Sequence, residues 1–506
     1  MGERVQKSLI NAKVNLLFYF LSLFFSFYSR KIFLDCLGVD FIGLTGTLGN
    51  ILGYLNLAEL GIGGAVSIFL YKPLLQKDRR SIQEILSLLG FLYRRIGLFI
   101  GAAGILVSLF FPLIFSQADL SLGIVYFVFY SFLGSSLIGY FINYRQILLT
   151  ADQKNYLVSI YFQSAGLIKT ALQIWLVYKF KNLYVWVAIE FIFSVFACII
   201  LNWRINREYP WLVTNPKNGK ELLEKYPSII KNTKQIFIHK FKDFLLTRSD
   251  ELFIFVFVSL KMVAFYGNYL MIVNKVTLLI NSALDSTLAG VGNLVAEGDK
   301  KNMIKVFWEL MAIRHFFAGF VCFSIYNLLE PFISLWLGPE YILNHSILVM
   351  LLIYTYIANS RGVVDMFNHS HGLYADTWSA WVEVIINISI TFIVGYFYGL
   401  FGILLGKIVS VTIIVIFWKP YYLFSSGFKL PISTYWNGTI KYYLINGFSF
   451  ISAYFISSHF VKMSISNFLD LVIYGIIIVG LYLIINILLM YFFGKGTRSL
   501  IKRFIK

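Results

Sequence analysis

Long apolar runs separated by short polar loops recur along all 506 residues of the chain. We identify fourteen runs, and a helix of about 20 apolar residues crosses the ~30 Å hydrocarbon layer of a membrane. The pattern therefore predicts an all-α polytopic membrane protein with about 14 transmembrane helices. The predicted spans are residues 14–34, 41–70, 85–115, 121–149, 155–178, 183–203, 235–260, 264–294, 304–329, 342–366, 377–398, 400–422, 440–461 and 467–493.

The second and eighth runs share an outline that indicates an internal duplication. Residues Gly38–Asp78 and Ser259–Asp299 each contain a short link, a long apolar helix with one acid, and a charged turn that ends in Asp. The Ala-Asp pair at Ala151-Asp152, after the fourth run, has a counterpart at Ala375-Asp376, after the tenth. Repeats with an even number of spans are parallel and related by an axis along the membrane normal.

The duplication divides the chain into four predicted parts. Residues 1–205 and 235–425 form two six-helix lobes, and the polar segment 206–234 links them on the cytoplasmic side. Residues 426–506 contain helices 13 and 14 and a basic cytoplasmic tail.

Composition excludes a soluble globular protein, because 58% of the residues are hydrophobic and only 13% are charged. Basic residues in the loops between spans account for the net charge of +18, so this charge does not indicate binding to nucleic acid. With the N-terminus inside, cytoplasmic segments hold 27 Lys and Arg residues and the outer loops hold 6. Basic loops face the cytoplasm, so both termini are predicted to be cytoplasmic and nucleic acid is not an expected partner.

Charged and amide side chains inside the spans are candidates for function, because a charge at membrane depth is unfavourable unless it faces a partner or a water-filled cavity. Asn56 and Glu59 share a face of the predicted helix 41–70, as Asn281 and Asp285 do on the predicted helix 264–294. The spans hold ten bases against eight acids, a small surplus that fits an anionic cargo. The candidates for lining a binding cavity are Arg94, Lys169, Lys275, Arg314, Lys407, Asn56 and Asn281.

Some of these charges also have a structural explanation. Arg94 lies about ten residues into its span and is long enough to reach the membrane interface. Arg248 is spaced to pair with Glu251, and Arg361 with Asp365. The candidates for coupling or charge balance are Glu59, Arg248, Asp250, Asp285, Arg361 and Asp365.

The sequence contains no enzyme motif: GxxxxGK[ST], HExxH, CxxC and the nucleophile elbow are all absent. We therefore expect no enzymatic activity and no cofactor, and a coupling ion, Na⁺ or H⁺, is left open. His369 and His371 have a metal-like spacing but stand alone in a predicted turn, so no metal site is predicted.

Seven stretches carry a family resemblance: LGVDFIGLTGTLGNILGYLNLAELGIGGA, LLTADQKNYL, HKFKDFLLTRSDELFI, YGNYLMIVNKV, GVGNLVAEGD, FISLWLGPEYIL and GLFGILLGKIVSVTIIVIFWKPYYL. They resemble the bacterial polysaccharide-unit flippases, within the superfamily that also holds multidrug and toxic-compound extruders. The resemblance implies two six-helix lobes around a central cavity that opens alternately to either side of the membrane. It also implies that the two extra helices border a groove for a lipid tail.

The resemblance leads to the expectation of a flippase for undecaprenyl-pyrophosphate-linked oligosaccharide, the building unit of a capsule, O-antigen or similar polymer. The expected location is the bacterial cytoplasmic membrane. The expected partners are the lipid-linked oligosaccharide, membrane lipids, a polysaccharide polymerase and glycosyltransferases. In this interpretation the basic side chains attract the pyrophosphate, and the acids bind a coupling cation or balance charge.

Two other interpretations stay open. An ion-coupled exporter of small cationic compounds would share the fold but would favour an acidic cavity. A membrane polysaccharide polymerase or ligase would need catalytic residues on a sizeable outer loop, and every predicted outer loop is short.

Overall fold

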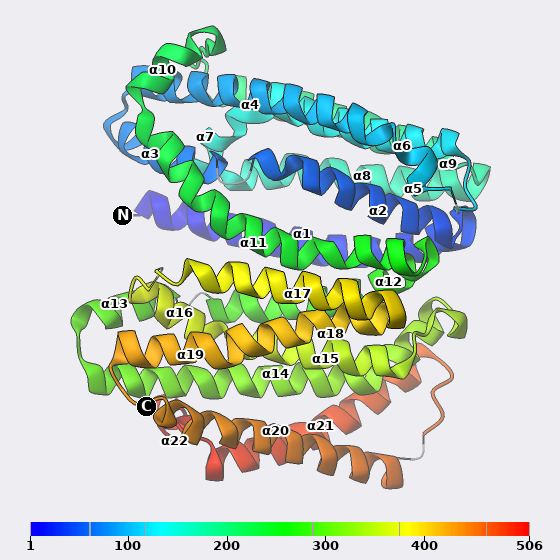
Figure 1. Cartoon of the computed structure of the whole chain (residues 1–506), viewed down its shortest axis with the longest axis vertical. Helices are drawn as coiled ribbons and strands as arrows, with labels where there is room; N and C mark the ends of the chain where they lie inside the picture. Colours follow the sequence, from blue (N-terminus) through cyan, green and yellow to red (C-terminus); the bar gives the residue numbers. More distant parts are fainter. Residues whose placement is uncertain are drawn as a thin grey trace. The chain divides into compact units, whose positions relative to one another are not determined.

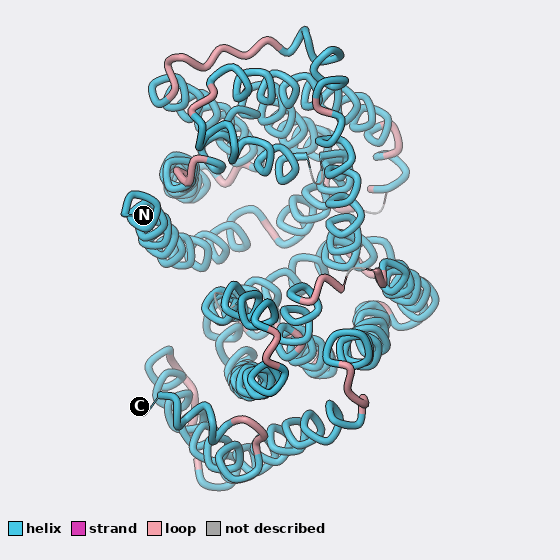
Figure 2. The backbone as a smooth tube through the Cα atoms, turned by 90° about the vertical axis from the view of Figure 1, so that its left-hand side faces the viewer, coloured by secondary structure: helices cyan, strands magenta, loops and turns pink. Residues whose placement is uncertain are grey.

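The structure, a computed structural model, describes residues 2–59, 62–116, 118–285, 288–373, 375–461 and 463–504. Every regular element in these ranges is a helix (Figure 1; Figure 2). All fourteen predicted spans fall on helices, which confirms the all-α polytopic fold class.

Ten of the described helical segments are long and apolar enough to cross a membrane. The other four predicted spans are not among these ten helical segments, for two reasons. Span 41–70 is broken into short helices, and the helices of spans 155–178, 235–260 and 440–461 carry more polar or charged side chains.

The chain divides into two compact units, which we describe separately. The first contains residues 1–255 and 259–264, and the second contains residues 256–258 and 265–506. The linker and most of α11 thus group with the first unit. The predicted boundaries of the two repeats stay a prediction.

In the first unit, α1 packs on α8, α8 on α9, α9 on α6 and α6 on α4 (Figure 1). Its helices are α1 (Gly2–Leu37), α2 (Val39–Leu55), α3 (Ile62–Gln76), α4 (Arg79–Ser108), α5 (Phe111–Ile114), α6 (Leu122–Ile142), α7 (Gln146–Ala151), α8 (Asn155–Phe180), α9 (Leu183–Glu208), α10 (Gly219–Lys225) and α11 (Pro227–Phe257).

In the second unit, α17 packs on α18, α18 on α15 and α15 on α14, while α14 contacts both α20 and α21. Its helices are α12 (Leu260–Asp285), α13 (Leu288–Glu297), α14 (Lys300–Trp336), α15 (His345–Ser360), α16 (Gly362–Ser370), α17 (Thr377–Tyr398), α18 (Leu400–Val411), α19 (Lys419–Tyr422), α20 (Ser433–Phe460), α21 (Phe468–Phe493) and α22 (Thr497–Phe504). Two π-helical segments, Thr412–Trp418 and Leu423–Phe428, flank α19.

The prediction of one continuous helix over 41–70 is wrong. Helix α2 ends at Leu55, a 3₁₀ turn covers Asn56–Glu59, and α3 begins at Ile62. At the end of α2 the N–H of Asn56 still bonds to the carbonyls of Leu52 and Tyr54, and the chain then continues in the tighter 3₁₀ conformation. Glycines are about 1 kcal/mol less favourable in a helix than alanine, and they are frequent in this stretch. Asn56 and Glu59 therefore do not lie on the face of a long straight helix.

Breaks recur at matching places in the two halves of the chain. Residues 286–287 of the eighth predicted span lie outside the described residues, so no break is assigned between α12 (Leu260–Asp285) and α13 (Leu288–Glu297). A 3₁₀ turn, Asn143–Arg145, interrupts the fourth span, and Arg361 separates α15 from α16 in the tenth. The fourth and tenth spans are thus both divided, as a duplicated layout would have them.

The two Ala-Asp pairs after the fourth and tenth spans make similar anchors. The carboxylate of Asp152 accepts a hydrogen bond from the hydroxyl of Tyr209, just after α9, at 2.8 Å. The carboxylate of Asp376 accepts from the ammonium of Lys419 at 2.7 Å and from the indole N–H of Trp418 at 3.1 Å. In both units the carboxylate of a loop aspartate therefore bonds to the end of the helix that lies two spans later in the chain.

We expect an Asp376→Asn substitution to destabilise the folded protein by about 1–2 kcal/mol at pH 7. Burial alone would raise the pKa of Asp376, but donation from Lys419, Trp418 and Ser379 outweighs it and lowers the pKa. The stabilisation is therefore complete above the ordinary aspartate pKa of about 3.9 and is lost as the pH falls through the lower folded value. Thermal unfolding of the two proteins from pH 7 to pH 3 checks this. A difference that stays constant down to pH 3 would contradict it.

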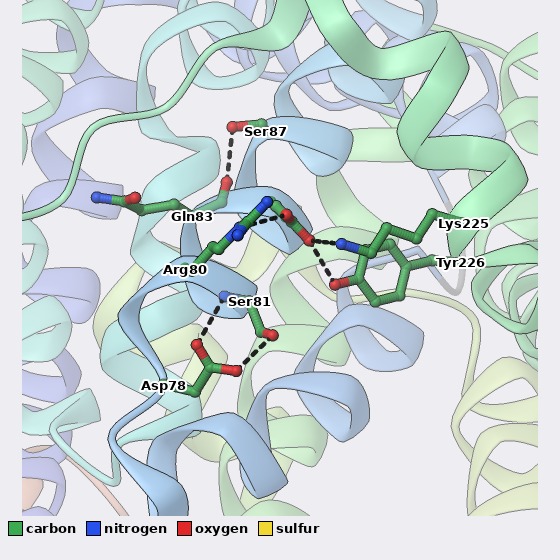
Figure 3. A network of polar contacts seen from close by, with 8 residues as sticks. Asp78, Arg80, Ser81, Gln83, Ser87, Lys225 and Tyr226 are labelled. Atoms are coloured by element: carbon green, nitrogen blue, oxygen red, sulfur yellow. Dashed lines mark hydrogen bonds and ion pairs between the residues drawn. The ribbon is translucent and has the colours of Figure 1, made fainter.

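The linker is docked on α4. The carboxylate of Glu84 accepts from the ammonium of Lys225 at 2.5 Å and from the hydroxyl of Tyr226 at 2.8 Å. Figure 3 shows Lys225 and Tyr226 reaching the first turns of α4, where Asp78 accepts hydrogen bonds from the backbone N–H and hydroxyl of Ser81. Further along, the Gln83 amide donates to a linker carbonyl, and the hydroxyl of Ser87 accepts from a linker N–H. The linker is therefore an integral part of the first unit.

Candidate functional site

The break between α2 and α3 is surrounded by hydroxyl groups in the first unit. The Asn56 side-chain carbonyl accepts from the hydroxyls of Ser136 at 3.0 Å and Tyr140 at 3.1 Å. The carboxylate of Glu59 accepts from the Tyr93 hydroxyl at 2.6 Å, and the rings of Tyr93 and Tyr140 meet edge to face at 5.5 Å. The structure thus places Asn56 and Glu59 in one tyrosine-lined cluster between α2, α4 and α6.

The predicted acids of α11 are close to α2. Asp250 is buried, with 3% of its surface exposed. The carboxylate of Glu251 accepts a hydrogen bond from the amide of Asn50 at 2.5 Å. The side chain of Arg248 lies outside the described residues, so its predicted pairing with Glu251 stays a prediction.

Lys169 is paired across a helix interface. Its ammonium lies 2.5 Å from Oε1 of Glu190, so the base of α8 is balanced by the acid of α9. The other carboxylate oxygen accepts from the amide of Gln173 at 3.0 Å. Lys169 thus brings no net positive charge to its surroundings, and its predicted role in attracting an anion stays a prediction.

Removing one member of this pair is expected to be more harmful than removing both. A Lys169→Met variant leaves the Glu190 carboxylate without its cation in an apolar interface, which we expect to destabilise the protein by about 1–3 kcal/mol. A Lys169→Met and Glu190→Leu double variant should recover most of this loss. Thermal unfolding of purified single and double variants checks the order, and equal losses in both would contradict it.

Arg94 lies apart from the cluster around Asn56 and Glu59. It lines a separate pocket together with Arg145, beside the linker. Within the part of the chain that the structure describes, the guanidinium of Arg94 makes no hydrogen bond or ion pair, and the side chain is exposed.

The second unit contains a buried arginine at the junction of three helices. Arg314 of α14 is only 4% exposed, and its guanidinium donates to the side-chain carbonyl of Asn281 on α12 at 2.7 Å. Gly362, at the start of α16, lies so close to the guanidinium that no side chain would fit there. The structure therefore brings together two predicted residues, Arg314 and Asn281. Lys275 is half-buried on the same helix as Asn281, and the side chain of Asp285 lies outside the described residues.

Two other predicted bases of the second unit lie on different helices. Lys407 of α18 is 7% exposed, and its ammonium lies 4.5 Å from the centroid of the Tyr354 ring. A cation over an aromatic face is stabilised by the ring quadrupole. Arg361 forms an ion pair with Asp365 one turn later, at 3.4 Å and partly exposed, so these two charges balance each other.

The sequence patterns missed a buried polar network in the second unit. The His315 ring lies 2.9 Å from the Tyr356 hydroxyl, which accepts from the amide of Asn446. The side-chain carbonyl of Asn446 accepts from the hydroxyl of Tyr482 and the amide of Asn486. These side chains join α14 and α15 to α20 and α21. The four-residue spacing of Tyr482 and Asn486 was the one signal of a shared polar face.

Comparisons with known proteins identify the fold of this chain but assign it to no family. No protein-family model matches the chain, and no curated protein does. The structure shares its fold with solved structures of membrane transport proteins. The structure is similar to that of the lipid II flippase MurJ in an inward closed conformation, with a TM-score of 0.66 and 16% identity over 97% of this chain and 100% of that chain.

Two transporter structures have the same fold over less of the chain. An inward-facing multidrug resistance MATE family transporter of the MOP superfamily gives a TM-score of 0.59 at 13% identity, over 83% of this chain and 98% of that chain. The Vibrio cholerae MATE transporter VcmN gives 0.50 at 12% identity, over 85% and 99%. At these identities the likeness defines the fold alone.

Proposed function

We propose that this protein is a flippase that moves undecaprenyl-pyrophosphate-linked oligosaccharide units across the bacterial cytoplasmic membrane by alternating access. The product would supply the synthesis of a surface polysaccharide such as a capsule or O-antigen. In this proposal both termini are cytoplasmic, and the partners are the lipid-linked oligosaccharide, membrane lipids, a polymerase and glycosyltransferases. The chain itself performs no enzymatic step.

The extent of the structural match is the observation that carries this proposal. The MurJ structure, whose title names a lipid-linked cargo, matches 97% of this chain and the whole of its own. The MATE structures leave 17% and 15% of this chain unmatched. A cargo with a lipid anchor therefore agrees better with the full helix complement than a small soluble compound does.

The charges of the second unit suit a pyrophosphate. Arg314 is buried yet keeps a hydrogen bond to the neutral amide of Asn281. Lys407, also buried, faces an aromatic ring, and Lys275 is half-buried on α12. Guanidinium and ammonium groups form strong charge-assisted hydrogen bonds with phosphate oxygens. We propose that these three bases attract the head group, while Glu59, Asp250 and Asp285 balance charge or bind a coupling cation, Na⁺ or H⁺.

Reconstitution tests the function directly. The purified full-length protein in liposomes should accelerate the appearance of lipid-linked oligosaccharide on the opposite leaflet, measured by access of an added glycan-modifying enzyme. Empty liposomes and liposomes with the Arg314→Ala variant are the controls. No acceleration with any candidate glycan would contradict the proposal.

A second candidate is an ion-coupled exporter of small cationic compounds. The structural likeness to MATE transporters and the buried acid Asp250 favour it. It predicts that expression in a drug-sensitive host raises resistance to cationic dyes, with loss of the effect in an Asp250→Asn variant. The flippase predicts unchanged dye resistance.

A further inference from the structure

A basic pocket of about 390 Å³ lies in the first unit between α4, the end of α6, α9 and the linker. Two arginines, Arg94 and Arg145, line it. The amide of Asn202 and the hydroxyls of Tyr144 and Thr214 add polar groups, and none of its lining residues is acidic. The chemistry of the wall therefore suits an oxyanion.

No acid among the described residues that line the pocket cancels its positive charge. The two terminal guanidinium nitrogens of Arg145 donate to the neutral side-chain carbonyls of Asn206, at 2.9 Å, and Asn202. These bonds hold the Arg145 fork in place without neutralising it. The acid at the end of α9, Glu208, is already paired with Arg204 at 2.7 Å and with Lys154 at 3.0 Å. A ligand that fills the pocket thus meets two guanidinium charges, of which one, Arg94, makes no bond within the described protein.

The depth of the pocket favours a lipid over a dissolved ion. Helix α4 has 30 residues, Arg79–Ser108, and about 20 suffice to cross the hydrocarbon layer. Its first turns bind the linker through the ion pair of Glu84 with Lys225, so they lie outside that layer. Counted back from Ser108, about 20 residues begin near residue 89, so Arg94, the sixteenth residue of the helix, lies about 8 Å inside the layer. Its long side chain reaches back toward the head groups.

The rim of the pocket is apolar and exposed. Val213 of the linker is 71% exposed and Phe141 of α6 is 37% exposed. Trp203, which follows the lining residue Asn202 in α9 but does not itself line the pocket, is 48% exposed and carries the guanidinium of Arg207 over its ring at 4.2 Å. Tryptophan and arginine are typical of the membrane interface. Basic walls with an apolar rim at this depth match a phosphate head group with its acyl chains.

We propose that this pocket binds the phosphate of an anionic membrane phospholipid, held by Arg94 and Arg145 on the outside of the first unit. The lipid is a structural ligand and not the transported cargo. Because the linker residues Leu212, Val213 and Thr214 form one wall, a bound lipid joins the linker to α4 and α9. Membrane lipid composition would thereby affect how firmly the linker is held. The proposal does not depend on the transported substrate.

The test uses the full-length protein in nanodiscs of phosphatidylcholine with increasing phosphatidylglycerol. Native mass spectrometry counts the retained lipids, and thermal unfolding reports stabilisation. Arg94→Gln is the main variant, because loss of this side chain removes no hydrogen bond from the described protein. Arg95→Gln is the matched control, since Arg95 is next in the chain and stacks on the Phe91 ring at 4.3 Å outside the pocket.

Wild type and Arg95→Gln should retain phosphatidylglycerol over phosphatidylcholine equally, whereas Arg94→Gln should bind it about tenfold more weakly. Arg94→Lys should fall between them, because lysine keeps the charge but not the fork. Equal loss in the Arg94 and Arg95 variants would overturn the proposal in favour of non-specific attraction. Displacement of the lipid by millimolar inorganic phosphate would overturn it in favour of a free-anion site. Loss of reconstituted transport in Arg94→Gln with unchanged phosphatidylglycerol binding would place Arg94 in the transport path instead.

Discussion

Replacing Arg314 by alanine is expected to reduce surface polymer at least tenfold while the protein stays in the membrane. The guanidinium is buried at the junction of α12, α14 and α16 and donates to Asn281. A charge-assisted contact with a phosphate contributes about 1.5–3 kcal/mol, which corresponds to a change of about 10-fold to 100-fold in binding. Polymer staining of a strain that depends on the plasmid-borne protein measures the loss.

Two further variants separate binding from folding. Arg314→Lys keeps the charge and should retain partial function, and Lys179→Ala, which removes an exposed base near the end of α8, should behave as wild type. Protein amounts are matched by immunoblotting of membranes. Normal polymer in Arg314→Ala at equal protein would remove Arg314 from the site, and normal polymer in Lys275→Ala would do the same for Lys275.

Replacing Gly402 by valine is expected to prevent α17 and α18 from packing. A Cβ atom at Gly402 would overlap the backbone of Val394 and Gly395, and one at Gly406 would meet the backbone of Thr391. The two glycines are four residues apart, so they form a small-residue stripe that lets two helix backbones approach. Overpacking destabilises by about 1–3 kcal/mol and occasionally by more, and the overlap here is with backbone atoms, which cannot move aside as a side chain can. We expect loss of most folded protein on fluorescence-detected size exclusion.

Gly480 of α21 provides the matched control. A Cβ at Gly480 would meet no atom within 4 Å, so Gly480→Val should fold with a yield near that of wild type. Equal yields of Gly402→Val and Gly480→Val would mean that the α17–α18 approach is looser than the structure has it.

The helices could be predicted from sequence because hydrophobicity is averaged over about twenty residues. All fourteen runs are helical, and the ion pair between Arg361 and Asp365 follows from their four-residue spacing. The breaks could not be predicted in this way. The four residues of the 3₁₀ turn at Asn56–Glu59 have little effect on a hydropathy averaged over twenty residues, yet this turn interrupts the α-helix.

The partners of the buried polar groups were also beyond a sequence pattern. Lys169 and Glu190 are 21 residues apart, and Arg314 and Asn281 are 33 apart. Such pairs are decided by which helix faces meet, which hydropathy does not encode.

The docked linker has a consequence for cleavage by proteases. Segment 209–226 contains the exposed lysines Lys217, Lys220 and Lys225, which trypsin would cut readily in a free polar tether. Its bonds to Glu84 and Ser87 and the packing of Gly219 against the Phe91 side chain must open before a protease can bind it in extended form. Resistance of this segment to brief digestion would therefore report, in an intact membrane, how much of the time it leaves α4.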